Sequence, residues 1–487
     1  MFRKSIALLL TLLLLMTAVS ESPYTSYTQD AWGNSVPAPD SYLPRAAFNC
    51  LAETGKALKA PSDLFVWNDR IIYVSDSGND RIVVLDADYS CLRVIDRYTD
   101  RDGVEYAVKN PAGIFVDGES RLYICLPDEE KVVVLNAEDK LTAEYLRPET
   151  DLLDDNTRFS PEKVLANRLG TVFVLPKGLY LGAVMYGREG NFLGFYGAND
   201  VAVTVQVLLD HAWKQILSQE QVSSMARYVP VQFSSFDIDG ENFIYTCTNE
   251  NNTYREISKL NTLGDNVLTS YTRNVVSQTY DYGDIEKGYY MGQVQDTRLV
   301  DICVNDRELI YALDKTRGRV FVYDQESHLL SIFGGPGYQM GTFHNPAAID
   351  TFGDDVLVLD SETGLITVFE RTGYGELMEN AVLMYIDGRY AEARTLWEEV
   401  ICRNINCTLA YTGIGKALYE EGSYREAMHY FELGYDREGY SRAYEEYRKM
   451  TARAILPYVF TVAAVAAVGT VIYVKVRRRR KGGAQDE

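Results

Sequence analysis

The histidines are the side chains best suited to acid–base chemistry or metal binding, and the sequence has four: His211, His328, His344 and His429. They lie in unrelated sequence contexts, so a metal site with three histidine ligands is not expected. The sequence also lacks the G-x-S-x-G, P-loop and H-E-x-x-H motifs. We expect His344, in the segment GTFHNP, to be a hydrogen-bonded turn residue. With no catalytic residue to name, we predict that the chain is not an enzyme.

The cysteines and carboxylates give no clearer site. Seven cysteines are scattered without a C-x-x-C pair, which is typical of neither a zinc site nor a disulfide scaffold. Three lie in apolar runs and are expected to be core residues: Cys125, Cys247 and Cys303. Two pairings remain open for the others, Cys50 with Cys91 and Cys402 with Cys407. A calcium site made of carboxylates also remains open, although no EF-hand loop is present; otherwise we expect no metal and no cofactor.

Both ends of the chain have the features of membrane targeting. The uncharged run from Ala454 to Val474 is long enough to cross about 30 Å of hydrocarbon. The basic segment KVRRRRKGG follows it and is expected to stay in the cytoplasm. At the other end, Arg3 and Lys4 precede a short apolar stretch and small residues before Glu21, the pattern of a cleaved signal peptide. We predict one membrane helix, with the N-terminus outside the cell and the C-terminus inside.

The charge of the chain limits its partners. The net charge is −21, and both basic clusters lie at the ends, so the part predicted to be extracellular is more acidic still. Such a surface repels nucleic acids and anionic lipid head groups. We therefore exclude nucleic-acid binding and expect either a basic partner or simple solubility.

Most of the extracellular part consists of internal repeats. Two of the copies begin PSDLFVWNDRIIYVSD and PAGIFVDGESRLYICL, each with short apolar strands separated by polar turns. Six such copies begin at Pro61, Pro111, Pro161, Phe233, Arg298 and Pro346. Four short strands in each stretch of about 40–50 residues are typical of a β-propeller blade. The sequence thus predicts a mainly β fold, a propeller of six blades.

The best-conserved phrases are YVSDSGNDRIVVLD at Tyr73, YALDKTRGRVFVYD at Tyr311 and VLDSETGLITVFE at Val358. This pattern resembles the NHL repeat. The resemblance implies a structural role for the aspartate after the second strand, which accepts backbone hydrogen bonds in the turn. The aspartates at this position are Asp76, Asp314 and Asp360, whereas copies two and three have Leu126 and Leu175 there. Some six-bladed propellers are hydrolases, lactonases or lyases with a metal or histidine cluster at the central channel. Only His344 could approach such a channel here.

The sixth copy is one strand short. An unassigned strand-like segment, Arg45 to Glu53, precedes the first blade and can supply the missing outer strand. Closing the ring in this way leaves no free sheet edge. Between copies three and four, residues 200–228 show apolar spacing typical of helices. This insertion is either a lid or a binding element.

A second repeat system follows the propeller. The phrases DGRYAEARTLW and EGSYREAMHYF are about 34 residues apart, and the family with this period is the tetratricopeptide repeat, which they resemble. The resemblance implies a helix–turn–helix unit in which glycines make the turns, alanines allow close packing and aromatic side chains fill the space between helices. The residues at these positions are Gly388, Tyr390, Ala393, Trp397, Gly415, Gly422, Tyr424, Ala427 and Phe431.

These features divide the chain into six parts. They are a signal peptide (1–20), an N-terminal extension (21–44), a six-bladed NHL-like propeller (45–373), tetratricopeptide-like helices (375–453), a transmembrane helix (454–474) and a basic cytoplasmic tail (475–487). The architecture favours a Gram-positive surface protein whose propeller binds an external ligand or protein. The helical repeats would dock a membrane partner, for example a transport complex. A channel-site hydrolase or lyase of the lactonase type is the alternative, and a structural scaffold or assembly factor is a third possibility.

Overall fold

The structure is a computed structural model of the whole chain. It describes residues 22–150, 152–153, 158–197, 232–249, 256–268, 282–284, 288–290 and 293–482. The predicted signal peptide and the predicted helical insertion at 200–228 lie outside the described residues. The chain divides into two compact units, Met1–Glu379 and Asn380–Glu487, and each is described by itself.

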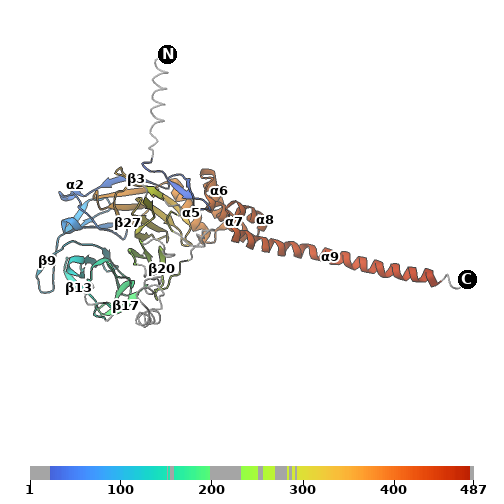
Figure 1. Ribbon diagram of the computed structural model, residues 1–487, viewed down its shortest axis with the longest axis horizontal. Helices are drawn as coiled ribbons and strands as arrows, with labels where there is room; N and C mark the ends of the chain where they lie inside the picture. The colour runs from blue at the N-terminus through green and yellow to red at the C-terminus, as the bar shows by residue number, and fades with distance from the viewer. Residues whose placement is uncertain are drawn as a thin grey trace, which may run out of the picture. The chain divides into compact units, whose positions relative to one another are not determined.

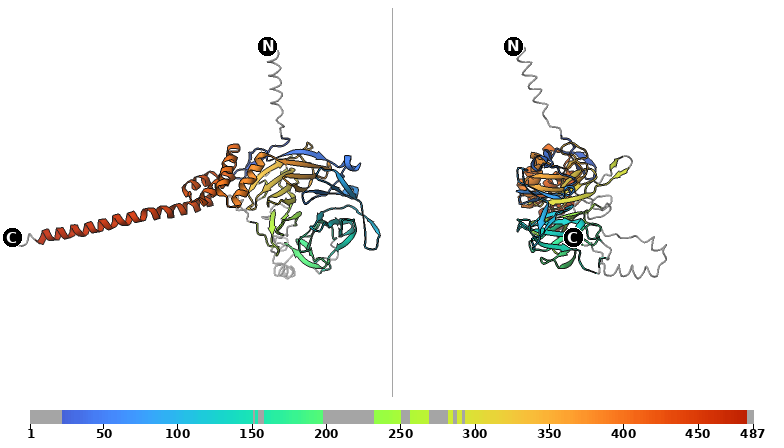
Figure 2. Two further views of the ribbon diagram at one scale, coloured as in Figure 1. Left: turned by 180° about the vertical axis from the view of Figure 1, so that it is seen from behind. Right: turned by 90° about the vertical axis from the view of Figure 1, so that its left-hand side faces the viewer.

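The first unit is a six-bladed β-propeller, as the sequence predicts (Figures 1 and 2). Each blade is an antiparallel sheet, and its strands follow one another outward from the centre. Blade one consists of β4(Asp63–Trp67), β5(Ile71–Asp76), β6(Arg81–Leu85) and β7(Cys91–Ile95). Blade two consists of β10(Ile114–Val116), β11(Leu122–Leu126), β12(Lys131–Leu135) and β13(Leu141–Leu146). Blade three consists of β14(Pro161–Ala166), β15(Val172–Pro176), β16(Ala183–Tyr186) and β17(Phe192–Tyr196). Blade four consists of β18(Ser235–Ile238), β19(Ile244–Cys247) and β20(Ile257–Leu260). Blade five contains β23(Leu299–Val304), β24(Ile310–Asp314), β25(Arg319–Tyr323) and β26(Leu329–Gly334). Blade six consists of β27(Pro346–Phe352), β28(Asp355–Asp360), β29(Leu365–Arg371) and β3(Tyr42–Phe48).

The middle strands of the blades are buried on both faces. Segments such as RIVVL in β6 and RVFVY in β25 are fully buried, which suits β-branched and aromatic residues between two packed sheets. The apolar clusters run from blade to blade, so that Ile82 in blade one packs in the same cluster as Ile124 in blade two. The hydrophobic core of the propeller is therefore a ring of interfaces between neighbouring sheets.

The ring closes through the N-terminal part of the chain, which confirms the predicted closure. Strand β3 pairs antiparallel with β29, with Tyr42 opposite Arg371 and Phe48 opposite Ile366. The predicted bounds of this strand were displaced toward the C-terminus, because Leu51–Thr54 forms a short helix, α2, and not strand. Pairing the first and last strands of the ring removes the open sheet edge of blade six.

The N-terminal extension is more ordered than the sequence indicates. Strands β1(Tyr27–Gln29) and β2(Ser35–Pro37) form a hairpin that pairs with the outer strand β26 of blade five. This blade therefore has six strands. Two further hairpins, β8(Arg97–Thr99) with β9(Glu105–Ala107) and β21(Gly288–Tyr290) with β22(Gln293–Gln295), form two-stranded sheets of their own.

Helix α5(Gly373–Ile386) begins in the propeller unit. The carboxylate of Glu379 is buried there and accepts hydrogen bonds from Tyr42 Oη at 2.7 Å and Arg307 Nη1 at 3.2 Å. Arg371 makes a further ion pair with it. Two arginines thus compensate one buried acid, and the start of α5 is fixed to the closing blade.

The second unit consists of helices. They are the last residues of α5, then α6(Tyr390–Arg403), α7(Thr408–Glu420), α8(Tyr424–Leu433) and α9(Arg437–Gly482). Gly388 and Gly422 have φ of 75° and 80°, a left-handed conformation that glycine adopts at little cost in the turns before α6 and α8. The same pair of backbone hydrogen bonds closes both turns, as expected for two copies of one motif.

Small residues make space for the two large aromatic residues of the helical unit. Trp397 and Phe431 are each 2% exposed. A Cβ atom at Gly413 would lie 2.5 Å from the indole of Trp397, and one at Gly415 would lie 2.8 Å from the ring of Phe431. Ala393 and Ala427 are fully buried beside them, whereas the rings of Tyr390 and Tyr424 pack at a steep angle against tyrosines of the preceding helices.

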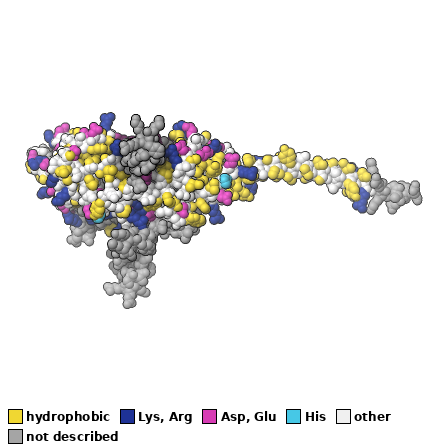
Figure 3. Space-filling view, turned by 90° about the horizontal axis from the view of Figure 1, so that it is seen from above, with side chains coloured by type: hydrophobic (Ala, Val, Ile, Leu, Met, Phe, Trp, Pro, Cys, Tyr) yellow, Lys and Arg dark blue, Asp and Glu magenta, His cyan; other side chains and the backbone are white. Residues whose placement is uncertain are grey.

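Helix α9 is one unbroken helix that contains Pro457 (Figure 2, left). It includes a stretch of mean hydropathy 2.2, none of which is buried, and this stretch is long and apolar enough to cross a membrane. Figure 3 shows hydrophobic side chains along its length. All seven cysteines are free thiols, so neither of the two possible disulfides is formed.

Candidate functional site

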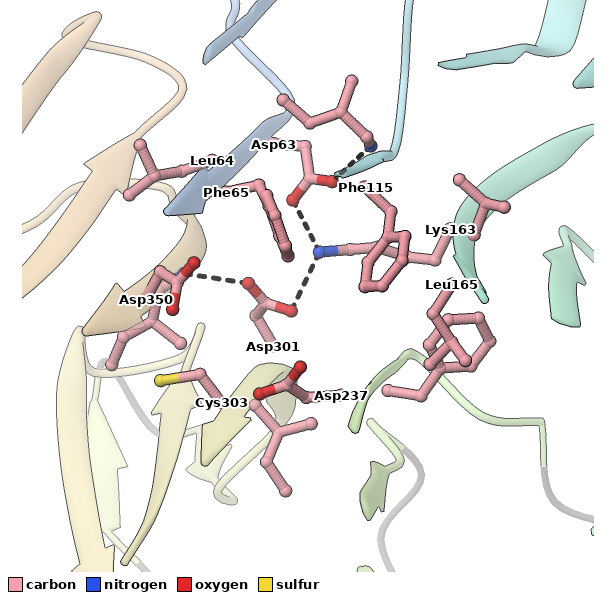
Figure 4. A pocket seen from close by; sticks show the side chains of 15 residues that line it. Asp63, Leu64, Phe65, Phe115, Lys163, Leu165, Asp237, Asp301, Cys303 and Asp350 are labelled. Atoms are coloured by element: carbon pink, nitrogen blue, oxygen red, sulfur yellow. Dashed lines mark hydrogen bonds and ion pairs between the residues drawn. The ribbon is translucent and has the colours of Figure 1, made fainter. Parts of the chain in front are cut away.

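The innermost strands of the blades surround a small cavity at the centre of the propeller (Figure 4). Alternate residues of a strand point to the same side, so each inner strand contributes side chains in layers. One layer contains the charged residues Asp63, Lys163 and Asp301. The next layer takes one residue from each blade in turn: Phe65, Phe115, Leu165, Asp237, Cys303 and Asp350.

Lys163 of blade three bridges two carboxylates, one from blade one and one from blade five. Its Nζ lies 2.7 Å from Asp63 Oδ1 and 2.9 Å from Asp301 Oδ1 (Figure 4). Both aspartate side chains are 4% exposed, and that of Lys163 is 15% exposed. Strand β14, which contains Lys163, approaches blade two closely. A Cβ at Gly113 would lie only 2.4 Å from the carbonyl oxygen of Glu162.

The channel carboxylates also connect neighbouring blades. Four of them each accept a hydrogen bond from a backbone N–H of the next inner strand, over distances of 2.6–2.8 Å. The pairs are Asp63 with Ile114, Asp237 with Val304, Asp301 with Ile349, and Asp350 with Val66. Because Asp350 reaches from the last blade to the first, these bonds include the closing point of the ring.

Electrostatics keep the lysine charged. Burial alone would lower the pKa of Lys163, but the charges of Asp301 and Asp63 outweigh burial and hold that pKa above its usual range. Burial raises the pKa of Asp63, and the charge of Lys163 opposes this effect. The lysine therefore acts as a fixed internal cation between two buried acids.

The second layer contains acids without such a cation. Burial raises the pKa of Asp237 to about 7, against the opposing effect of hydrogen bonds from the backbone of Val304 and Ile238. Burial, followed by the charge of Asp237, also raises the pKa of Asp350 well above its usual value. Both side chains line the cavity and retain some exposed surface. A carboxyl group that titrates near neutral pH can donate or accept a proton in a reaction.

The cavity is small. Its volume is about 30 Å³, enough for ordered water molecules and far below the roughly 300–1,000 Å³ of small-ligand pockets. Chemistry inside it would thus involve a water molecule or a proton, and a larger ligand would have to bind at the mouth of the channel.

Asp237 should make the stability of the protein depend on pH. Its folded-state pKa is higher than that of an unfolded aspartate, so the folded state binds the proton more tightly. The free energy of unfolding should therefore fall as the pH rises from about 4 to about 7, by up to about 4 kcal/mol. Asp237→Asn should remove the part of this fall that is due to Asp237, leaving that due to Asp350, and raise the melting temperature at pH 8. A pH profile of thermal unfolding that is identical in the wild type and this variant would contradict the assignment.

The aspartates named by the NHL-like pattern lie outside this cavity. Asp360 accepts backbone hydrogen bonds from His344, Asn345, Glu362 and Thr363. Asp76 accepts one from Lys59 N at 2.7 Å and pairs with Arg81. Asp314 accepts bonds from Arg298 N and Thr316 N and pairs with Arg319. All three hold turns around the start of a blade.

His344 does not line the cavity either. Its Nδ1 lies 2.6 Å from Glu362 Oε2, and its ring stacks on Tyr338 with 4.7 Å between ring centres. This is the hydrogen-bonded turn position that the sequence analysis expects.

In the part of the chain that the structure describes, no three His, Cys, Asp or Glu side chains are grouped so that they could hold a metal ion. The place between Asp63 and Asp301, where a cation would bind, contains the Lys163 amine. Of the tetratricopeptide-like residues, Ala393, Trp397, Ala427 and Phe431 are buried, and none of the nine lines this cavity.

Sequence reasoning missed every charged residue of the channel. A usable signal was present, because charged residues interrupt otherwise apolar first strands, as in PSDLFV, PEKVLA and LVDICV. Alignment of the six copies in columns places these residues at equivalent positions.

No protein-family model and no curated protein matches the chain. The resemblances to NHL and tetratricopeptide repeats therefore remain resemblances. Among solved structures, a virginiamycin B lyase from Staphylococcus aureus is similar at 9% identity and a TM-score of 0.38, over 67% of this chain and 99% of that one. A streptogramin B lyase matches at 9% identity and 0.41, over 69% and 100%. A gluconolactonase from Xanthomonas campestris matches at 12% identity and 0.39, over 69% and 97%.

These similarities concern the fold. The similar proteins are enzymes, and this finding contradicts our expectation from the sequence that the chain is not an enzyme.

Proposed function

We propose that the protein is anchored in the cell membrane by the C-terminal part of α9, with the propeller outside the cell as a ligand-binding domain. The helical unit then docks a partner in or at the membrane, for example a transport complex. The net charge of −21 is in keeping with an exposed, soluble propeller that binds no nucleic acid.

One observation carries this proposal: the helix that packs in the helical unit is the same helix that carries the apolar stretch. Ala443 of α9 is fully buried, and a Cβ at Gly439 would lie 2.6 Å from the ring of Phe431 in α8. From Ala443 to Ala454 the helix rises by about 17 Å. If the apolar stretch spans the bilayer, the helical unit is held close to the membrane surface.

The docking role can be tested by melting the helical unit selectively. Trp397→Ala should destabilise this unit by about 3–5 kcal/mol, because a large buried side chain is lost from a small core. We expect the full-length variant to lose its membrane partners in pull-downs from detergent extracts while the propeller remains folded. Glu398→Ala is the matched control, since the neighbouring side chain is 53% exposed. Partners retained after the helical unit has demonstrably melted would overturn the docking role.

A second candidate is a hydrolase or lyase that acts at the central channel. The observation in its favour is the carboxyl group of Asp237, which lines the cavity and has a pKa of about 7. Under this hypothesis Asp237→Asn abolishes turnover of lactone substrates, whereas Glu362→Gln, beside the exposed His344, does not. Turnover that is unchanged in Asp237→Asn would exclude the channel acid as the catalyst.

A further inference from the structure

The last turns of α9 before its apolar stretch carry positive charge that is not neutralised. From Tyr447 to Val474 the sequence has three cations, Arg448, Lys449 and Arg453, and no Asp or Glu. Lys449 pairs with two glutamates of the preceding turn, at 2.9 and 2.8 Å. Arg448 and Arg453 are exposed and form no ion pair in the part of the chain that the structure describes; Arg448 interacts with Glu445 only at longer range. The guanidinium group of Arg453 is therefore available to an anion.

Three features place Arg453 at the boundary between head groups and hydrocarbon. The uncharged run begins at the next residue, Ala454. Pro457 has no N–H to donate to the carbonyl oxygen of Arg453, four residues earlier, and a carbonyl group without this bond is costly in hydrocarbon. Tyrosines mark both ends of the run: Tyr458 is 75% exposed and Tyr473 is 63% exposed. Tyrosine is enriched at this depth, where its ring lies in the apolar region and its hydroxyl in the polar one.

We propose that Arg453 and Arg448 bind the phosphate groups of anionic lipids on the N-terminal side of the apolar run. This inference rests on the proposed anchoring of the protein by α9, and in the proposed orientation these lipids belong to the outer leaflet. The two arginines are about 7–8 Å apart along the helix axis, close to the thickness of one head-group layer, which is about 5–8 Å. They are about 140° apart around the axis, so each meets a different lipid.

The chemistry of the guanidinium group favours this ligand. Arginine binds phosphate oxygens through two parallel hydrogen bonds, and its long side chain can reach the phosphate level from the edge of the hydrocarbon. In a zwitterionic lipid the phosphate is already balanced by the ammonium group of the same molecule, whereas in an anionic lipid it is not. The chain as a whole carries −21 and repels anionic head groups, so any preference for them has to arise locally.

Quenching of tryptophan fluorescence by brominated lipids would test the proposal on the full-length protein in vesicles. Tyr458→Trp places an indole just inside the membrane from Arg453, and Tyr473→Trp places one at the other end of the run. The four native tryptophans lie outside the run, so lipids brominated in their acyl chains report on the introduced indole. The vesicles consist of phosphatidylcholine with a minor fraction of brominated phosphatidylglycerol or, in parallel, of brominated phosphatidylcholine.

In Tyr458→Trp we expect brominated phosphatidylglycerol to be enriched around the indole about fivefold over brominated phosphatidylcholine, the preference that one basic residue near a membrane surface provides. Adding Arg448→Gln and Arg453→Gln should bring this ratio close to one, and replacing both arginines by lysine should retain part of it. The same two glutamine substitutions combined with Tyr473→Trp should leave the quenching there unchanged, because that indole contacts lipids of the opposite leaflet.

Arg425→Gln with Arg437→Gln is the control for net charge, because it removes two exposed arginines of the helical unit that are far from the apolar run. This variant should keep the preference of its Tyr458→Trp parent. Equal quenching by the two brominated lipids in Tyr458→Trp, or a preference that survives in Arg448→Gln/Arg453→Gln, would overturn the lipid site alone. No quenching by either lipid at either position would show that α9 does not enter the bilayer, which would overturn the anchoring and this site with it.

Discussion

Replacing Lys163 by methionine should lower the free energy of unfolding by about 3–5 kcal/mol at neutral pH. The substitution leaves Asp63 and Asp301, each 4% exposed, without their shared cation, and breaking a buried ion pair by removing one partner is strongly destabilising. Urea unfolding of the full-length protein in detergent, followed by tyrosine and tryptophan fluorescence, measures the loss. The loss should shrink at acid pH, where the two carboxyl groups can take up protons.

The matched control is Lys177→Met, because this lysine is 72% exposed and pairs with Glu162 at the surface. That variant should change the unfolding free energy by less than about 1 kcal/mol. A triple variant that also carries Asp63→Asn and Asp301→Asn should recover much of the stability, since the amides can still accept the backbone hydrogen bonds. A Lys163→Met protein as stable as the wild type would show that the charged bridge is not part of the core.

Deleting strand β3 should destabilise the propeller by about 5 kcal/mol or more. The deletion of Tyr42–Phe48 removes the ladder with β29 and the buried tyrosine whose hydroxyl meets Glu379. Each net backbone hydrogen bond contributes about 0.5–1.5 kcal/mol, and the burial of one large side chain contributes about 1.5–3 kcal/mol. Thermal unfolding of the full-length protein by circular dichroism would report the change.

Removing Arg101, Asp102 and Gly103 from the exposed turn between β8 and β9 is a suitable control, because that turn is outside the ring of blades. The melting temperature of the variant with this shortened turn should stay close to that of the wild type. If the β3 deletion melts at the same temperature as this control, the ring does not depend on closure by the N-terminal strand.

The blades could be predicted because each repeat carries its own signal. Apolar strands such as IIYV and RLYI recur in phase with polar turns, and six copies in register leave few alternatives to a propeller. The sixth repeat lacks its own outer strand, so another segment had to provide it, and this segment is β3. The hairpin of β1 and β2 could not be foreseen, because strands of three residues are too short to show a period.

The candidate sites were much harder to predict than the fold. Asp237 and Asp350 come from repeats more than a hundred residues apart, and only closure of the ring brings them to one axis. Their pKa values depend on burial in a cavity that no local pattern describes. A second, larger cavity, between the N-terminal segment and strands β25 and β26, has the same difficulty, because its N-terminal wall pairs with a strand about 300 residues later.

The helical unit lies between these cases. The repeat spacing and the resemblance to tetratricopeptide repeats predicted turns at Gly388 and Gly422, and the structure places both in left-handed turns. Gly413, which leaves space for Trp397, was overlooked because the first copy has the large Glu379 at the equivalent position, whereas at the position of Gly415 it has the small Ala381.

The orientation of the chain in the membrane is the most direct test of the proposed function. In a background that carries Cys402→Ser, which removes the one exposed cysteine, a single reporter cysteine would be placed either at Leu169, 82% exposed on blade three, or at Gly483 in the basic tail. Intact cells would be treated with a membrane-impermeant maleimide, before or after permeabilisation. We predict that Leu169→Cys is labelled on intact cells and that Gly483→Cys is labelled only after permeabilisation. The reverse pattern, or equal labelling of both sites on intact cells, would contradict an extracellular propeller anchored by α9.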